Sequence, residues 1–79
     1  MNTKQTLLFF GQIAELMNCN SLEVNAEKTT KELIEALKKS HHELEQKIFA
    51  IAVNEKIVKG NFELKENDTI AFLPPFAGG

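Results

Sequence analysis

The sequence has a single cysteine and no arginine, and these two shortages exclude several classes of function. Cys19 cannot form an intramolecular disulfide, a zinc site built from thiols or a Cys-x-x-Cys redox pair, because each of these needs a second cysteine. No histidine lies near it in the sequence to raise its thiolate fraction, so we interpret Cys19 as an incidental thiol. All the basic residues are lysines, spread along a chain of net charge −2. Without a basic stripe or an arginine cluster, we expect no nucleic-acid partner.

Long apolar runs are also missing. No stretch approaches the ~20 residues of a membrane span, so we expect no membrane segment. Residues 1–5 lead into a short apolar run without the h-region and cleavage site of a secretory signal, and we therefore expect a cytoplasmic protein. A chain of 79 residues, 43% hydrophobic and 25% charged, suits one small globular domain. We expect this domain to span residues 1–75 and a flexible tail to span residues 76–79.

Several short segments have the pattern of β-strands. Residues 6–10 are apolar after Thr6, which predicts a strand buried on both faces. Residues 22–25 alternate apolar and polar side chains, as in a half-exposed strand that returns beside the first. Asn54 and Glu55 predict the turn of a hairpin. The remaining predictions are strands at 49–53, 56–58 and 69–73, a short helix at 12–17, and Leu44 placed under the core.

One substantial helix is predicted. Thr29 and Glu32 match a capping box, and an apolar stripe follows that extends to about Ser40 or His41. His41 and His42 could be read as metal ligands, but adjacent helical residues point about 100° apart and no third ligand is evident. We therefore interpret the histidine pair as part of a solvated helix end and expect no metal site.

These elements predict an α+β fold with two layers, because a single amphipathic helix covers only one face of a sheet. The first and last strands have the longest apolar runs and should lie centrally, side by side and parallel. Alternation then gives each of these strands one helix-facing set and one outward set of side chains. The outward set, joined by Ile57, should form an apolar patch of the kind that marks a partner surface. The helix-facing set is Leu7, Phe9, Ile70 and Phe72, and the outward set is Leu8, Phe10, Ala71 and Leu73.

The stretch 74–79 has an unusual composition. Pro74 and Pro75 cannot donate to a sheet ladder, so the last strand must stop before them. Gly78 and Gly79 have no side chain to obstruct a narrow channel. A pair of glycines at a chain end is often a frayed terminus, but these glycines follow a strand and a rigid spacer. We therefore expect the working atom to be in the carboxylate of Gly79.

A carboxylate becomes an acyl donor only after activation, for example when it is joined to AMP. The tail has no catalytic side chain, so the ATP site must belong to an activating enzyme, and this chain must supply a docking surface and a thin terminus. Two outcomes remain open at this point. An amine attacks and the protein becomes attached to a target, or sulfur attacks and Gly79 becomes a thiocarboxylate.

The chain resembles the small-subunit family of molybdopterin synthase over essentially its whole length. The most specific part of the resemblance is Pro-Pro followed by two residues and Gly-Gly, since a Gly-Gly end alone also fits the thiamine-pathway sulfur carrier and ubiquitin. Asn67 stands where that family usually has glycine, and asparagine is the next-best residue for a left-handed backbone. The segments that carry the resemblance are 8–12, 52–54, 67–72 and 74–79.

The resemblance implies a ubiquitin-like β-grasp fold, with a mixed sheet of about five strands. It implies adenylation of Gly79 by a ubiquitin-activating-type enzyme that uses ATP, then thiocarboxylation with sulfur from a sulfur-donating protein. The tail would insert into the large synthase subunit of a heterotetramer, whose active site builds the dithiolene of molybdopterin from a cyclic pterin precursor. This chain would be a non-catalytic sulfur donor with no bound cofactor. The expected site residues are Gly79 as carrier, Gly78 and Ala77 as the approach, Pro74 and Pro75 as the spacer, and Phe10, Ile57, Leu73 and Phe76 as apolar docking contacts.

Three other functions remain open from the sequence. The chain could be a protein modifier conjugated to lysines through Gly79, or a sulfur carrier of another pathway such as thiamine or tungsten-pterin synthesis. It could also be an interaction module with an idle tail. Cellular conjugates that depend on Gly79 would favour the modifier, and full function without Gly78 and Gly79 would favour the module.

Overall fold

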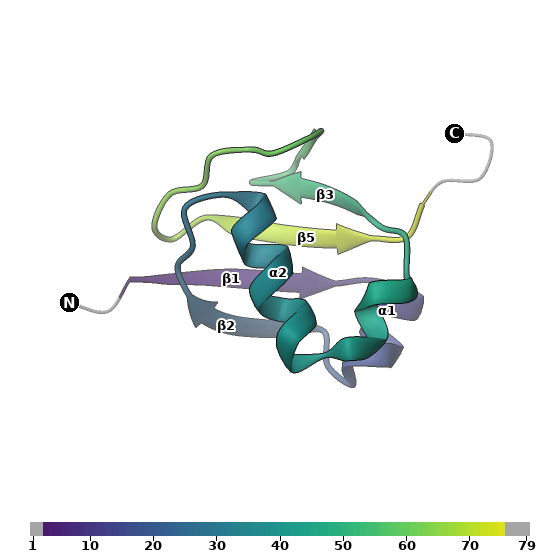
Figure 1. The fold of residues 1–79 in the computed structure, drawn as a ribbon. Helices are drawn as coiled ribbons and strands as arrows, with labels where there is room; N and C mark the ends of the chain where they lie inside the picture. Colours follow the sequence, from purple (N-terminus) through teal and green to yellow (C-terminus); the bar gives the residue numbers. More distant parts are fainter. Residues whose placement is uncertain (1–2, 76–79) are drawn as a thin grey trace.

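The computed structural model describes residues 3–75 and shows a mixed five-stranded sheet with one long helix across one face (Figure 1). The predicted α+β fold is therefore confirmed. The expected tail residues Phe76, Ala77, Gly78 and Gly79 lie outside the described residues. Within the described range, no helix has the length and apolar content required to cross a bilayer. The elements are β1 (Lys4–Phe9), α1 (Gln12–Met17), β2 (Ser21–Asn25), α2 (Thr30–Ser40), the 3-10 helix η1 (His42–Gln46), β3 (Ala50–Val53), β4 (Lys56–Val58) and β5 (Thr69–Leu73).

The strand order in the sheet is β2-β1-β5-β3-β4, so β5 is the central strand. As predicted, the first and last strands are neighbours and run parallel, with Leu7 opposite Ile70 and Phe9 opposite Phe72. The pairs β1–β2, β5–β3 and β3–β4 are antiparallel. Because β5 is hydrogen-bonded to β1 on one side and to β3 on the other, the strand that leads into Pro74 is an interior strand of the sheet and not an edge strand.

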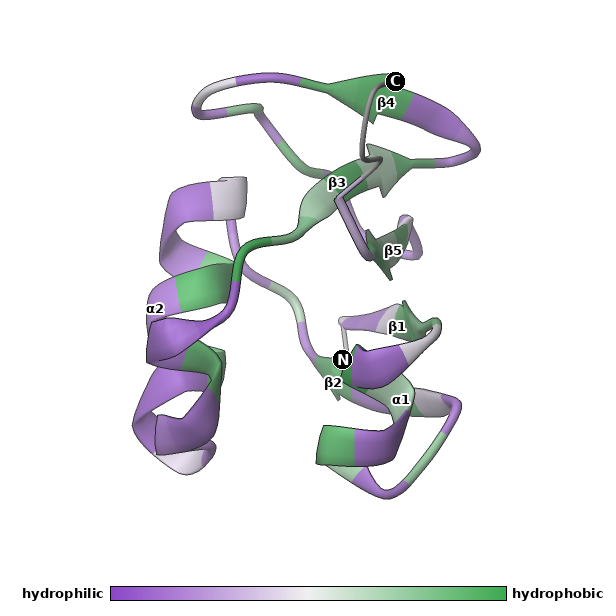
Figure 2. Ribbon diagram, turned by 90° about the vertical axis from the view of Figure 1, so that its right-hand side faces the viewer, coloured by the Kyte–Doolittle hydropathy of each residue, from purple (hydrophilic) through white to green (hydrophobic). Residues whose placement is uncertain are grey.

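The hydrophobic core lies between the sheet and α2. Phe9 and Phe72 are almost fully buried, and their ring centroids are 5.5 Å apart. The prediction that the first strand is buried on both faces is wrong, because burial alternates along β1 and Phe10, just beyond it, is 45% exposed. Figure 2 shows the physical reason: α2 lies on one side of the strands, and no helix covers the other side of β3 and β5.

The helix α2 begins at the predicted N-cap, Thr29, but the returning bond of the capping box reaches the residue before it. The Thr29 hydroxyl accepts a hydrogen bond from the Glu32 N–H at 3.2 Å, and the Glu32 carboxylate accepts one from the Lys28 N–H at 3.3 Å. The helix ends at Ser40, within the predicted range, but the interpretation of the histidines is half wrong. His42 is exposed, whereas His41 is partly covered and its Nδ1 is buried without a hydrogen-bond partner among the described residues. The chain enters η1 directly after His41, and Leu44 of η1 is completely buried, as the sequence predicts.

A buried amide joins three parts of the chain that the sequence patterns do not connect. The side chain of Gln5 is fully buried on β1. Its Nε2 donates to the carbonyl oxygens of Glu27 and Lys65, at 2.9 and 3.1 Å, and its Oε1 accepts from the Glu27 N–H at 3.0 Å. This one side chain therefore holds the segment before α2 and the turn before β5 against the edge of the core.

Candidate functional site

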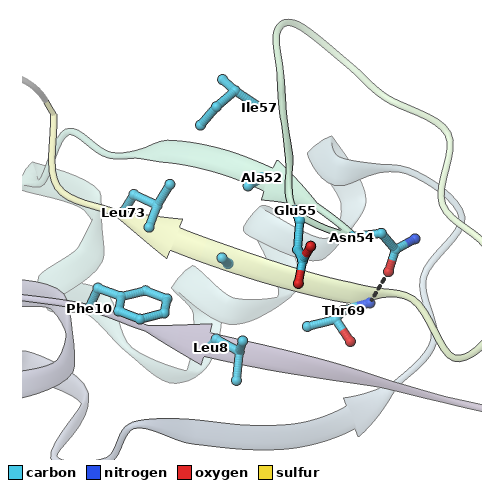
Figure 3. A pocket seen from close by; sticks show the side chains of 9 residues that line it. Leu8, Phe10, Ala52, Asn54, Glu55, Ile57, Thr69 and Leu73 are labelled. Atoms are coloured by element: carbon cyan, nitrogen blue, oxygen red, sulfur yellow. Dashed lines mark hydrogen bonds between the residues drawn. The ribbon is translucent and has the colours of Figure 1, made fainter. Parts of the chain in front are cut away.

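The uncovered face of the sheet has a shallow apolar depression with a volume of about 540 Å³, here called the open-face groove (Figure 3). Side chains from four strands and from the residues that adjoin them meet there. One end is apolar and lies where β5 leads to Pro74, and the other end is polar and lies at the β3–β4 turn. The lining residues are Leu8, Phe10, Ala52, Asn54, Glu55, Ile57, Thr69, Ala71 and Leu73.

Three of the four predicted docking residues lie together in this groove. Phe10 and Ile57 are 45% and 55% exposed, and Leu73 is partly covered between them on β5. The fourth, Phe76, lies outside the described residues. The alternation of β1 and β5 therefore predicted the apolar end of the groove correctly. Whether these side chains contact a partner stays a prediction.

The polar end of the groove was not identified from the sequence, where Asn54 and Glu55 indicated only a turn. Asn54 is held from three directions: its Oδ1 accepts from the Thr69 N–H at 3.0 Å, its Nδ2 donates to the Asp68 carboxylate at 2.9 Å, and its own N–H donates to the Thr69 carbonyl at 2.8 Å. The second Asp68 oxygen accepts from the Lys65 N–H at 2.7 Å. Two of the segments that carry the family resemblance, 52–54 and 67–72, thus meet in one hydrogen-bond network. Two predicted strands that end and begin at these segments could have suggested that the segments are in contact, but not the hydrogen bonds that join Asn54 to Asp68 and Thr69.

The opposite end of the groove is where β5 passes into Pro74 and Pro75. β5 ends at Leu73, as the two prolines predict, and the Pro74 ring packs on Gly11. Gly11 has φ +60° and ψ −135°, a backbone conformation that suits glycine, and a Cβ placed there would lie 3.3 Å from Pro74 Cγ. The N–H of Phe10 donates to the Phe72 carbonyl at 3.2 Å, which extends the parallel ladder to this edge. Gly11 and Phe10 therefore fix the direction in which the chain leaves the domain.

The groove has the composition of a docking surface. Within residues 3–75 no group of three or more histidine, cysteine, aspartate or glutamate side chains is placed to hold a metal ion. Cys19 is partly buried, packs against the hydrophobic core and does not line the groove. Apolar side chains at one end and a fixed polar turn at the other are suited to recognition of a partner surface.

Comparison with known proteins gives the family. The ThiS family matches residues 7–79. The molybdopterin synthase sulfur carrier subunit of Escherichia coli is 32% identical over 78 residues, which cover 92% of this chain and 96% of that protein.

Two solved structures extend the comparison. A chain in the complex of subunits 1 and 2 of the molybdopterin-converting factor from Helicobacter pylori is similar at 32% identity with a TM-score of 0.71, covering 96% of this chain and 99% of that one. The modifier SAMP1 from Haloferax volcanii has a TM-score of 0.80 at 19% identity, covering 96% and 99%, which shows a shared fold alone. The resemblance predicted from the sequence is confirmed. This chain belongs to the ThiS family and is a relative of the sulfur carrier subunit of molybdopterin synthase.

Proposed function

We propose that this chain is the sulfur carrier subunit of a molybdopterin synthase. The observation that carries the proposal is 32% identity, across 92% of the chain, to the E. coli protein of that function. The fold supports it, because the central strand β5 both lines the open-face groove, through Thr69, Ala71 and Leu73, and leads directly into Pro74. A carrier of this kind needs a docking surface and a chain end close to it, since the folded domain must bind the partner while the C-terminus enters that partner's active site.

The proposed partner is the large subunit of the synthase. The H. pylori structure is a complex of subunits 1 and 2 of the converting factor, and this chain is similar to one chain of that complex over 99% of that chain's length. We assign the open-face groove as the surface that docks on the large subunit, with Phe10, Ile57 and Leu73 as its apolar contacts. An adenylating enzyme and a sulfur-donating protein are the other proposed partners, and we place these reactions in the cytoplasm.

The proposed chemistry occurs at Gly79. Its carboxylate oxygen attacks the α-phosphorus of ATP on the activating enzyme, which forms an acyl-adenylate and releases pyrophosphate. Hydrosulfide (HS⁻) delivered by the sulfur-donating protein then attacks the acyl carbon and displaces AMP, and loss of the sulfur-bound proton leaves a thiocarboxylate on Gly79. The folded body takes no chemical part. It docks on each partner and directs the tail, while the large subunit provides the site at which sulfur passes to the cyclic pterin precursor.

Intact-mass measurement tests this function directly. After incubation with the activating enzyme, ATP and a sulfur source, we expect a mass gain equal to the exchange of one oxygen for one sulfur. A variant that lacks Gly79 is the control and should show no gain. If the full chain shows no such exchange under conditions in which the enzyme consumes ATP, the sulfur-carrier function is wrong.

The shared fold with SAMP1 supports a second candidate, a protein modifier, because the fold alone fits both functions. The two differ in the nucleophile that attacks the activated Gly79. A modifier would form higher-mass conjugates with lysine side chains in cells, and deletion of Gly79 would abolish them. A sulfur carrier would instead restore molybdopterin synthesis when combined with the large subunit, without such conjugates.

A further inference from the structure

Glu55 is the only ionisable residue among those that line the open-face groove. Every other lining side chain is apolar or neutral. Figure 3 shows the side chain extending from the β3–β4 turn into the groove. The hydrogen bond marked there joins Asn54 to Thr69, and none reaches the Glu55 carboxylate from the residues drawn. A single negative charge therefore stands at the edge of an apolar surface.

The backbone at Glu55 is unfavourable for a glutamate. Two residues connect β3 to β4, and both have positive φ, 49° at Asn54 and 75° at Glu55, as in a type I′ turn. Asparagine tolerates this region well, whereas the second position of such a turn strongly favours glycine. Glu55 therefore holds its side chain in the groove at some cost in stability, and backbone strain of this kind concentrates at functional sites.

The direction of Glu55 is imposed by its neighbour. Asn54 is bound to Thr69 and Asp68 at the start of β5, so the turn geometry does not depend on contacts of Glu55 itself. On β4, Ile57 lines the groove, and alternation directs the adjacent Lys56 to the other face. The nearest lysine in sequence is thus poorly placed to neutralise the carboxylate.

A partner that covers the groove would enclose this charge. An ionised carboxylate buried without a partner is strongly unfavourable, so a surface that fits the groove must bring a cation to Glu55. We infer that Glu55 is a specificity-determining residue of the docking surface, and that it pairs with an arginine or lysine of the large synthase subunit. This rests on the proposed function, and it defines the partner surface as an apolar ridge with a basic side chain at the end remote from Pro74.

Affinity for the large subunit from the same organism, measured at low and high salt, tests the inference. We expect Glu55→Lys to weaken binding by about 10-fold or more at low salt, and the loss to shrink as salt screens the repulsion. Glu45→Lys is the matched control, since Glu45 is exposed on η1, away from the groove, and the substitution changes the net charge equally. It should bind like the wild type.

Glu55→Gly separates recognition from folding. Glycine removes the carboxylate and relieves the positive φ, so we expect the thermal midpoint to rise by about 2–5 °C while the affinity falls several-fold. A purely structural role would move stability and affinity in the same direction.

Binding and sulfur transfer, measured on the same proteins, separate a failure of the Glu55 contact from a failure of the sulfur-carrier function. If Phe10→Ala weakens binding but Glu55→Lys binds like the wild type, the groove docks the partner and the role of Glu55 is wrong. If the wild type gains sulfur at Gly79 but shows no affinity for the large subunit, the inference is overturned while the carrier chemistry stands. If it neither gains sulfur nor binds, the proposed function is also wrong.

Discussion

Replacement of Phe10 by alanine is the most direct test of the open-face groove. The side chain is 45% exposed at the end of the groove next to Pro74, and its backbone N–H donates to the Phe72 carbonyl independently of the side chain. The substitution therefore removes apolar surface from the groove without removing the hydrogen bond that holds this part of the chain.

The expected size of the effect follows from the exposed area. A phenylalanine side chain presents roughly 200 Å², so 45% exposure leaves ~90 Å² for a partner to cover. At about 25 cal/mol per Å², this area contributes about 2 kcal/mol to binding. We therefore expect Phe10→Ala to raise the dissociation constant for the large subunit roughly 30-fold.

The chain provides a matched control in Phe62. It is 40% exposed, close to the value for Phe10, but lies in the loop between β4 and β5 and does not line the groove. Its N–H donates to the Thr30 hydroxyl, and its carbonyl accepts from the Thr30 N–H, so its backbone is also anchored. Phe62→Ala should leave the affinity within a factor of about two.

Calorimetric titration of the two variants and the wild type against the large subunit measures the difference, after circular dichroism has shown that both variants are folded. Equal affinity of the Phe10 variant and the wild type would refute the assignment of the groove as the docking surface. An equal loss in both variants would mean that the effect comes from general destabilisation of the domain.

Two further predictions concern stability and are measured by urea unfolding. Gly11→Ala should lower the free energy of unfolding by about 1–2 kcal/mol, because alanine is strained at φ +60° and its Cβ would press on Pro74. The control is Gly60→Ala, also at positive φ but with no atom within 4 Å of the added Cβ, which should lower the free energy of unfolding by less. An equal loss in the two variants would show that the contact with Pro74 is unimportant. Gln5→Ala should lower the free energy of unfolding by about 1–3 kcal/mol, since three part-buried hydrogen bonds from a fully buried side chain are lost, whereas the exposed Gln12→Ala should change it little. Similar losses in both variants would contradict the role of the buried amide.

Sequence patterns predicted those features that depend on neighbours along the chain. Alternation on β1 separated Leu7 and Phe9 from Leu8 and Phe10, and the capping box located the start of α2. The features that were missed depend on contacts between distant segments. Gln5 donates hydrogen bonds to the carbonyl oxygens of Glu27 and Lys65, which are 22 and 60 positions further along the chain. Nothing in the local sequence of Gln5 distinguishes it from an exposed glutamine.

The same limit explains the incomplete prediction of the site. The apolar end of the groove follows from strand periodicity and was found. The polar end requires the β3–β4 turn to lie beside the start of β5, where Asp68 and Thr69 hold Asn54 and so direct Glu55. A two-residue turn can be recognised from its residues, but the strand on which it packs is determined by the topology of the whole sheet.

The position of the groove on β5 connects docking to delivery. Ala71 and Leu73 belong to the groove, and Pro74 follows without an intervening linker, with its ring against Gly11. A partner bound to the groove therefore also fixes the position of Pro74, from which the chain continues toward Gly79. A hinge at this point would let the end of the chain move while the body stayed docked, and misplacement by about 1 Å can cost 100-fold in rate. The Pro74–Gly11 contact and the two hydrogen-bonded neighbours of β5 resist that motion, which is why the central strand, and not an edge strand, should carry a reactive tail.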